Sequence, residues 1–176
     1  MDVDTRLDSP PAPALGTEGP RRISDAELET MASEIASSCA CFHLRQAARV
    51  VTRAYDRALD GIDLKITQLT MLVAVAKSQG RLSLVELADR LGMDRSTFSR
   101  NLGPLERRAL VTLSAEGRHR ARTVELTAAG RQLLAQAAPR WRAAQAELDA
   151  QLGAEETTAL LRQLRRLDAA DLVAAR

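Results

Sequence analysis

Aromatic side chains are scarce in this sequence. Phe, Trp and Tyr make up 2% of the 176 residues, whereas hydrophobic residues as a whole make up 45%. The apolar mass therefore consists mainly of Ala, Leu and Val, which favours helices that pack closely side by side. A chain of this length predicts one domain, or one domain with a tail.

Cysteine is scarce as well, with only Cys39 and Cys41 in the chain. Two cysteines at this spacing are not the disulfide framework of a small secreted protein. The N-terminus lacks the basic and then apolar pattern of a signal peptide, and no apolar run approaches the ~18 residues of a membrane span. We therefore expect a cytoplasmic protein without a membrane partner.

The residue types that catalysis needs are few. The chain has two histidines, and its sequence contains no Gly-rich phosphate loop, no spaced cluster of metal ligands and no Ser-His-Asp set. We therefore expect no enzyme, no cofactor and no metal site.

The excess of positive charge is small, since the net charge is +2 at pH 7. Bulk charge alone therefore does not indicate nucleic acid. Between Arg81 and Arg122, however, nine Arg face five acidic residues, a local net charge of +4 that leaves −2 for the remainder. The positive charge is thus concentrated in the middle of the chain, as in a DNA-binding segment.

Proline marks the start of the chain, and residues 1–22 have the composition of a disordered arm. Ser24 and Glu27 then have the spacing of a capping box, which predicts a long helix to about Leu59. Gly61 is expected to end this helix as its C-cap. A second helix is predicted over 67–78, and Gly80 stops it.

Residues 83–108 have the pattern of a helix-turn-helix. Ser83 opens a second capping box and a short helix, Gly92 provides the turn, and Asp94 is the N-cap of the next helix. That second helix reaches Arg108 at most, and Pro104 should kink it or end its regular part early.

The second of these helices carries the candidate DNA-reading residues. Phe98 and Leu102 anchor one face, so the polar residues near the N-terminus face outward. Arg can donate two bonds to a guanine edge, and Ser and Thr adapt to either base or to phosphate. The candidates are Arg95, Ser96, Thr97, Ser99 and Arg100, with Ser83 at the start of the preceding helix.

Two short strands, over 110–113 and 122–126, are predicted to follow, with a basic turn between them. A basic hairpin beside a reading helix is positioned to lay arginine into the adjacent minor groove. Arg118, Arg120 and Arg122 are the candidates. Thr127 is expected to cap a helix over 128–152, and a last helix is predicted over 154–172.

These segments together resemble the MarR family over about residues 30–170. The matching motifs are Leu87-Ala88, Leu91-Gly92-Met93-Asp94-Arg95-Ser96-Thr97, Arg100-Asn101-Leu102, Leu105-Glu106-Arg107-Arg108, Leu110-Val111 and Leu126-Thr127-Ala128-Ala129-Gly130-Arg131.

The resemblance implies a mainly α fold with a small β-hairpin wing, in which a winged helix-turn-helix core joins a helical dimerisation bundle. The corresponding divisions are a dimerisation helix over 23–62, a DNA-binding domain over 63–126 and C-terminal dimerisation helices over 127–176. It implies a homodimer that binds double-stranded DNA at a pseudo-palindromic operator, with repression favoured. Many relatives carry an Asp-Arg pair where this chain has Arg118-His119, so the minor-groove arginine stays divided among the three candidates.

Cys41-Phe42 resembles the organic-hydroperoxide-sensing branch of the family, and Tyr55 matches one of two tyrosines that bond the reactive cysteine there. Ile66 occupies the second tyrosine position. Cys39 and Cys41 lie about 200° apart around a helix, which disfavours a bond between them. Three interpretations stay open: packed cysteines without sensing chemistry, which is favoured, thiol oxidation, and soft-metal sensing.

A small-molecule effector is the other form of control that the family implies. His43, Arg45 and Arg49 could line a pocket for an anionic aromatic ligand, or could be exposed helix residues. The alternative to a DNA-binding regulator is a helical adaptor that uses the winged-helix scaffold to bind only protein.

Overall fold

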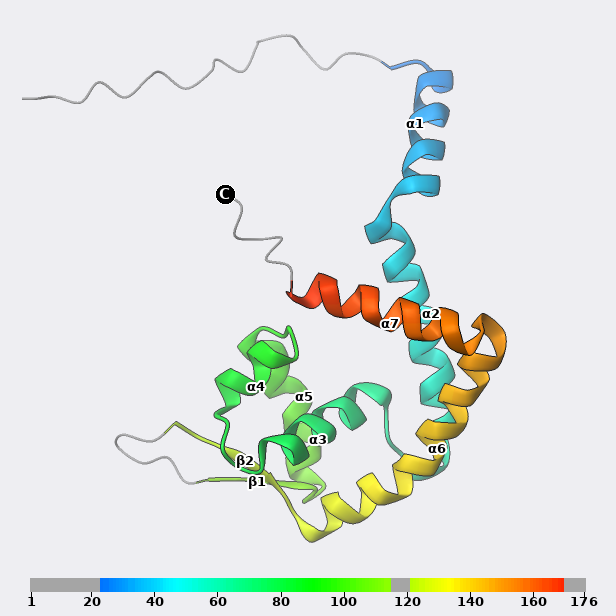
Figure 1. Ribbon diagram of the computed structural model, residues 1–176. Helices are drawn as coiled ribbons and strands as arrows, with labels where there is room; N and C mark the ends of the chain where they lie inside the picture. Colours follow the sequence, from blue (N-terminus) through cyan, green and yellow to red (C-terminus); the bar gives the residue numbers. More distant parts are fainter. Residues whose placement is uncertain (1–22, 115–120, 170–176) are drawn as a thin grey trace, which may run out of the picture. The chain divides into compact units, whose positions relative to one another are not determined.

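Figure 1 shows the computed structural model, which describes residues 23–114 and 121–169. This part of the chain is mainly helical with one two-stranded antiparallel sheet, which confirms the predicted fold class. Its helices are α1 (Asp25–Ser38), α2 (Ala40–Leu59), η1 (Asp60–Ile62, a 3-10 turn), α3 (Ile66–Ser78), α4 (Leu84–Arg90), α5 (Arg95–Arg107), α6 (Ala128–Leu152) and α7 (Ala154–Ala169), and its strands are β1 (Val111–Leu113) and β2 (Val124–Leu126). Within these residues, no helix is both long and apolar enough to cross a membrane.

The chain divides into two compact units, Met1–Arg45 and Gln46–Arg176. In the first unit, α1 begins as the sequence predicts. The Ser24 hydroxyl accepts from the Glu27 backbone N–H at 3.3 Å, and the Glu27 carboxylate accepts from the Ser24 N–H at 2.9 Å. This capping box satisfies two of the N–H groups that a helix start leaves without partners.

The single long helix predicted over 24–59 is wrong, because the chain leaves the helical conformation at Cys39 (φ −74°, ψ 107°). Two hydroxyls lie just before the break. Those of Ser37 and Ser38 both donate to the Glu34 carbonyl, at 3.1 and 2.7 Å. Such side-chain bonds compete with the backbone ladder and favour helix ends. A helical wheel therefore does not relate Cys39 to Cys41, and the geometric argument against a bond between them does not apply.

The predicted C-cap at Gly61 is also wrong. The residue with left-handed backbone is Asp63 (φ 49°), which follows the η1 turn and donates its N–H to the Asp60 carbonyl at 3.1 Å. Gly61 is instead closely approached by a side chain, since a Cβ there would lie 2.9 Å from Nη1 of Arg140. The position is crowded by α6 rather than conformationally special.

Among the described residues, the hydrophobic core lies in the second unit, formed by the end of α2, η1 and its loop, α3, α4, α5, the hairpin and α6. Leu87 and Ala88 of α4 are fully buried, and the small Ala88 side chain lets α5 pack closely on α4. Gly92 adopts φ 60° at the turn between the two helices, which glycine tolerates best. This is the helix-turn-helix that the sequence predicts.

Helix α5 does not end early at Pro104 but continues through it to Arg107. The residue before a proline resists helical geometry partly through its Cβ, and here that residue is Gly103. Leu102 and Leu105, on either side of the proline, are 4% and 0% exposed. Their burial offsets the hydrogen bond that the proline cannot donate.

The hairpin pairs Val111 with Leu126 and Leu113 with Val124, and an isolated bridge joins Ser83 to Thr123. The strands thus dock beside the start of α4 as well as on each other.

Thr127, at the start of α6, is hydrogen-bonded to the residues just before β1. The Thr127 hydroxyl donates to the Ala109 carbonyl at 2.6 Å and accepts from the Gly130 N–H at 3.0 Å, and the Thr127 N–H donates to the Leu110 carbonyl at 3.1 Å. Thr127 is therefore the N-cap that the sequence predicts. Helix α6 has the predicted bounds, while the predicted end of α7 at Leu172 lies outside the described residues.

Gly130 is the tightest point of this junction, because a Cβ there would overlap the Leu110 carbonyl oxygen. We expect Gly130→Ala to lower the free energy of unfolding by about 1–3 kcal/mol, as overpacking does. Urea unfolding measures the effect. A Gly130→Ala variant as stable as the wild type, or more stable, would contradict the prediction, since alanine is otherwise the better helix former.

Candidate nucleic-acid interface

Helix α5 has one buried and one exposed face. Phe98 is 1% exposed and lies against the core with Leu102 and Leu105. The intervening polar side chains consequently point away from the core. Arg95, Ser96, Ser99 and Arg100 are exposed and Thr97 is half-buried, so the structure places all five predicted reading residues at the surface of one helix end.

Asp94 organises this helix end. Its carboxylate accepts from the Ser96 hydroxyl at 2.6 Å, and from the Thr97 backbone N–H and hydroxyl, both at 2.8 Å. These three bonds, led by that from the Ser96 hydroxyl, hold the pKa of Asp94 well below its usual range. The carboxylate is therefore ionised at any pH at which the protein would bind DNA.

Arg100 lies one turn further along and contacts the same two hydroxyls. Its Nη2 is 3.4 Å from the Ser96 and Thr97 hydroxyl oxygens, and its Nε donates to the Ser96 carbonyl at 3.3 Å. The long distances indicate weak individual bonds. Together they direct the guanidinium towards Ser96 and Thr97, near the N-terminal end of the helix.

Ser83 is the N-cap of α4 and is half-buried. Its hydroxyl donates to Glu86 Oε2 at 2.7 Å and accepts from the Glu86 N–H at 3.2 Å, while its own N–H donates to Glu86 Oε2 at 2.8 Å. The backbone bond from Ser83, followed by the hydroxyl bond, lowers the pKa of Glu86. The proposed DNA contact of Ser83 thus coincides with a structural capping role.

Of the predicted wing residues, Arg122 is exposed, and its carbonyl accepts from the Leu84 N–H at 3.0 Å. This bond places Arg122 next to the start of α4. Arg118 and Arg120 lie outside the described residues, so the minor-groove assignment stays a prediction.

The candidate sensor residues differ in exposure. Cys39 is half-buried and Cys41 is exposed, and both are free thiols. Tyr55 is buried and donates its hydroxyl to Gln145 Oε1 at 2.6 Å. Burial and then the nearby charge of Asp149 raise the Tyr55 pKa. The phenol proton is thus already donated within the chain, and a sensor role for Tyr55 stays a prediction.

The three residues suggested for a ligand pocket are all exposed. His43 has its Nε2 3.3 Å from the Ser37 carbonyl and meets Phe42 edge to face, with ring centroids 5.5 Å apart. Arg45 and Arg49 follow on α2. Their role in ligand binding stays a prediction.

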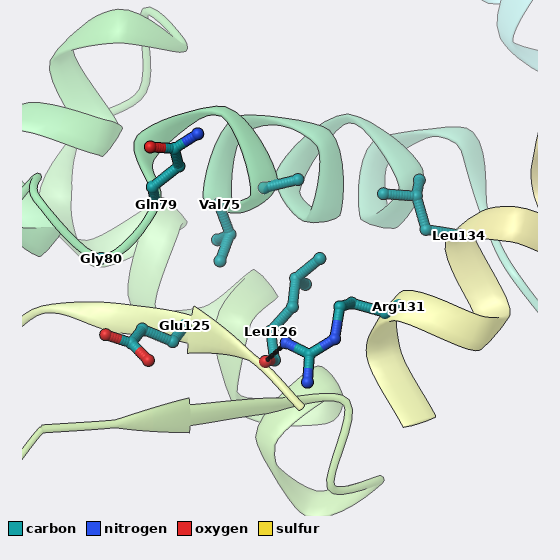
Figure 2. A pocket seen from close by; sticks show the side chains of 8 residues that line it. Val75, Gln79, Gly80, Glu125, Leu126, Arg131 and Leu134 are labelled. Atoms are coloured by element: carbon teal, nitrogen blue, oxygen red, sulfur yellow. Dashed lines mark hydrogen bonds between the residues drawn. The ribbon is translucent and has the colours of Figure 1, made fainter. Parts of the chain in front are cut away.

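Sequence reasoning missed two pockets that α3 and α6 line. Figure 2 shows one of them, about 380 Å³, with Glu125 of β2 and Arg131 of α6 among its polar side chains. The Arg131 guanidinium donates to the Leu126 carbonyl at 2.7 Å, which holds it along the pocket wall. The pocket thus combines two charged side chains with apolar walls.

The second pocket, also about 380 Å³, is almost entirely apolar. Val73 of α3 and Trp141 of α6 line it and are 40% and 42% exposed. The single tryptophan of the chain at an exposed helix position is the sequence signal that could have indicated it. Among residues 23–114 and 121–169, no three His, Cys, Asp or Glu side chains are grouped so that they could hold a metal ion.

The comparisons with known proteins converge on one family. A family model described as the MarR family matches residues 62–122. The crystal structure of the M. tuberculosis transcriptional regulator MosR in complex with DNA is 37% identical, with a TM-score of 0.69 over 79% of this chain and 100% of that one. A search of curated proteins gave no match.

The repressor CouR, known from Rhodococcus jostii RHA1, is also similar. Bound to a 23-mer DNA duplex, it is 25% identical, with a TM-score of 0.69 over 76% of this chain and 94% of that one. Bound to p-coumaroyl-CoA, it gives the same identity and coverage with a TM-score of 0.68.

The capping box at Ser83 predicts that the stability of the fold depends on pH. Because the folded-state pKa of Glu86 lies below its usual value of 4.5, its ionised form stabilises the fold above pH 4.5, and this contribution disappears as the pH falls through the lowered pKa. We expect Glu86→Gln to be less stable than the wild type near neutral pH and to match it in acid. Urea unfolding from about pH 7 to about pH 3 measures the difference. Glu106→Gln removes the same charge away from the capping box, and a similar pH profile for that variant would contradict the assignment.

Proposed function

This chain belongs to the MarR family, and from that membership we propose that it represses transcription as a homodimer on a pseudo-palindromic operator. It is a DNA-binding transcriptional regulator with a winged helix-turn-helix. The observation that carries the proposal is the N-terminal end of α5, whose polar side chains are held outward by the buried Phe98 and Leu102. Such a helix end reads base edges in the major groove.

Dimerisation is supported by apolar side chains that the single chain leaves exposed. In the first unit, Leu28, Met31 and Ile35 of α1 are 48%, 46% and 52% exposed. On α7, Leu160, Leu161 and Leu167 are 42%, 41% and 45% exposed. Runs of this kind on helices at both ends of a chain fit an isologous interface, in which each subunit buries the same surface of the other. Twofold symmetry then requires two half-sites about one helical turn apart.

We propose that a small molecule releases the regulator from DNA. CouR is known bound to p-coumaroyl-CoA, and the apolar pocket lined by Val73 and Trp141 offers an aromatic wall to a flat apolar group. The second candidate is thiol oxidation, which the exposure of Cys41 favours. From this role we also propose that the protein is cytoplasmic and has no catalytic activity.

The adaptor alternative is not favoured. An adaptor would need no cluster of base-reading side chains at the start of α5, where Arg100 contacts Ser96 and Thr97 and where Arg95 is exposed. It predicts DNA affinity that is weak, independent of sequence and lost near physiological salt.

The first test is fluorescence anisotropy on DNA from upstream of the gene, with a shuffled duplex as competitor at about 150 mM salt. Arg95→Ala should weaken binding to the preferred site by about 1–3 kcal/mol and relax the preference at one base pair, since a bidentate guanine contact is lost. Arg107→Ala is the matched control at the opposite end of the same helix and should leave the preference unchanged. Equal loss of preference in both variants, or wild-type binding that the shuffled duplex abolishes, would contradict the proposal.

A charge on the exposed apolar face of α7 tests dimerisation. Leu161→Asp should convert the protein to monomers and abolish tight operator binding, because burying an unpaired carboxylate in an apolar interface is strongly unfavourable. Gln163→Asp is the control on an exposed position of the same helix. Sedimentation equilibrium measures the mass of each, and a dimeric Leu161→Asp variant would exclude this face from the interface.

A further inference from the structure

The side chains at the start of α5 form one connected network rather than a set of independent groups. Asp94 accepts from both the Ser96 and the Thr97 hydroxyl, and Arg100 Nη2 donates to both hydroxyl oxygens. Each hydroxyl therefore has a carboxylate on one side and a guanidinium on the other. Ser96, Thr97 and Arg100 belong to the proposed interface, and Asp94 caps the helix that carries them.

The chemistry of these groups fixes the direction of every bond. An ionised carboxylate can only accept, and a guanidinium can only donate. A hydroxyl has one hydrogen and two lone pairs. The hydrogens of Ser96 and Thr97 are both donated to Asp94, and one lone pair of each receives Arg100, so each hydroxyl has only a lone pair left for another molecule.

We propose that Asp94 is a positioning residue that makes the Ser96 and Thr97 hydroxyls acceptors towards DNA, so that this end of α5 selects bases with a major-groove amino group. This inference rests on the proposed function, since it specifies how the same helix reads DNA. In the major groove only adenine N6 and cytosine N4 offer an amino donor. Guanine O6, thymine O4 and phosphate oxygens are acceptors, and each would face a lone pair of like polarity.

Arg95 and Arg100 supply the complementary chemistry. Arg100 is held by Nε and Nη2, which leaves its Nη1 hydrogens free for other acceptors, and Arg95, the first residue of the same helix, is exposed. The helix end thus presents donors on arginine and acceptors on the hydroxyls. A base step that pairs an acceptor-rich guanine with a neighbouring adenine or cytosine matches this arrangement.

The test combines one protein change with one change of a base. The preferred site is first selected from a random duplex library with the wild-type protein. Each adenine in it is then replaced by purine, which lacks the N6 amino group, and each cytosine by 2-pyrimidinone, which lacks the N4 amino group. We expect one or two of these replacements to weaken wild-type binding about 5- to 150-fold.

Asp94→Asn is the informative variant, because asparagine is as good an N-cap as aspartate but its amide also donates. At least one hydroxyl can then reverse its direction and donate to DNA. The amino-group replacements should therefore weaken Asp94→Asn much less than the wild type, at an unchanged urea midpoint. Thr97→Val, which removes one of the two acceptors, should lose the sensitivity at the base that this hydroxyl contacts.

Asp89→Asn controls for the lost negative charge, since it lies exposed on α4 of the same helix-turn-helix. It should keep the wild-type response to every base replacement. If Asp94→Asn and Asp89→Asn respond alike, or if the wild type tolerates every amino-group replacement, the positioning role is wrong while specific binding stands. A wild-type protein that selects no sequence from the library would overturn the proposed function itself.

Discussion

Burial of one face of α5 is the constraint on which the DNA-binding surface depends. Phe98, Leu102 and Leu105 are each less than 5% exposed and lie on a core that α3, α4 and the hairpin share. Each such side chain stabilises the fold by roughly 1.5–3 kcal/mol, whereas a single hydrogen bond contributes about 1 kcal/mol net. Packing therefore fixes the rotation of the helix, and a rotation that moved its reading residues would expose the core.

Polar contacts have a secondary role, because they orient side chains on a helix whose position the packing has already fixed. Asp94 caps α5 and directs two hydroxyls, and Ser83 with Glu86 does the equivalent at α4. All these groups are at least partly exposed, so their bonds compete with water and are individually weak. Their effect is to limit which hydrogen-bond patterns the surface can offer, which is a matter of specificity more than of stability.

Local signals in the sequence predict most of this fold. The two capping boxes, the cap at Thr127 and the turn at Gly92 depend on residues within three or four positions of each other, and all are present. The errors arise where distant or competing contacts decide. Gly61 is crowded by Arg140, 79 positions further along the chain, and the break at Cys39 follows two serine hydroxyls that a hydrophobic pattern does not register.

The same distinction separates the reading residues from the pockets. Helical periodicity buries Phe98 and so leaves Arg95, Ser96, Ser99 and Arg100 exposed, whereas the apolar pocket joins Val73 to Trp141 and no local pattern relates them. Leu134 of α6 lines both pockets and also packs against the core, and α3 contacts both α5 and α6. A ligand between α3 and α6 would therefore contact α3, the helix that packs against the reading helix α5. It could release DNA only by binding one spacing of these helices more tightly than the other, and the shared core is what would carry that difference to α5.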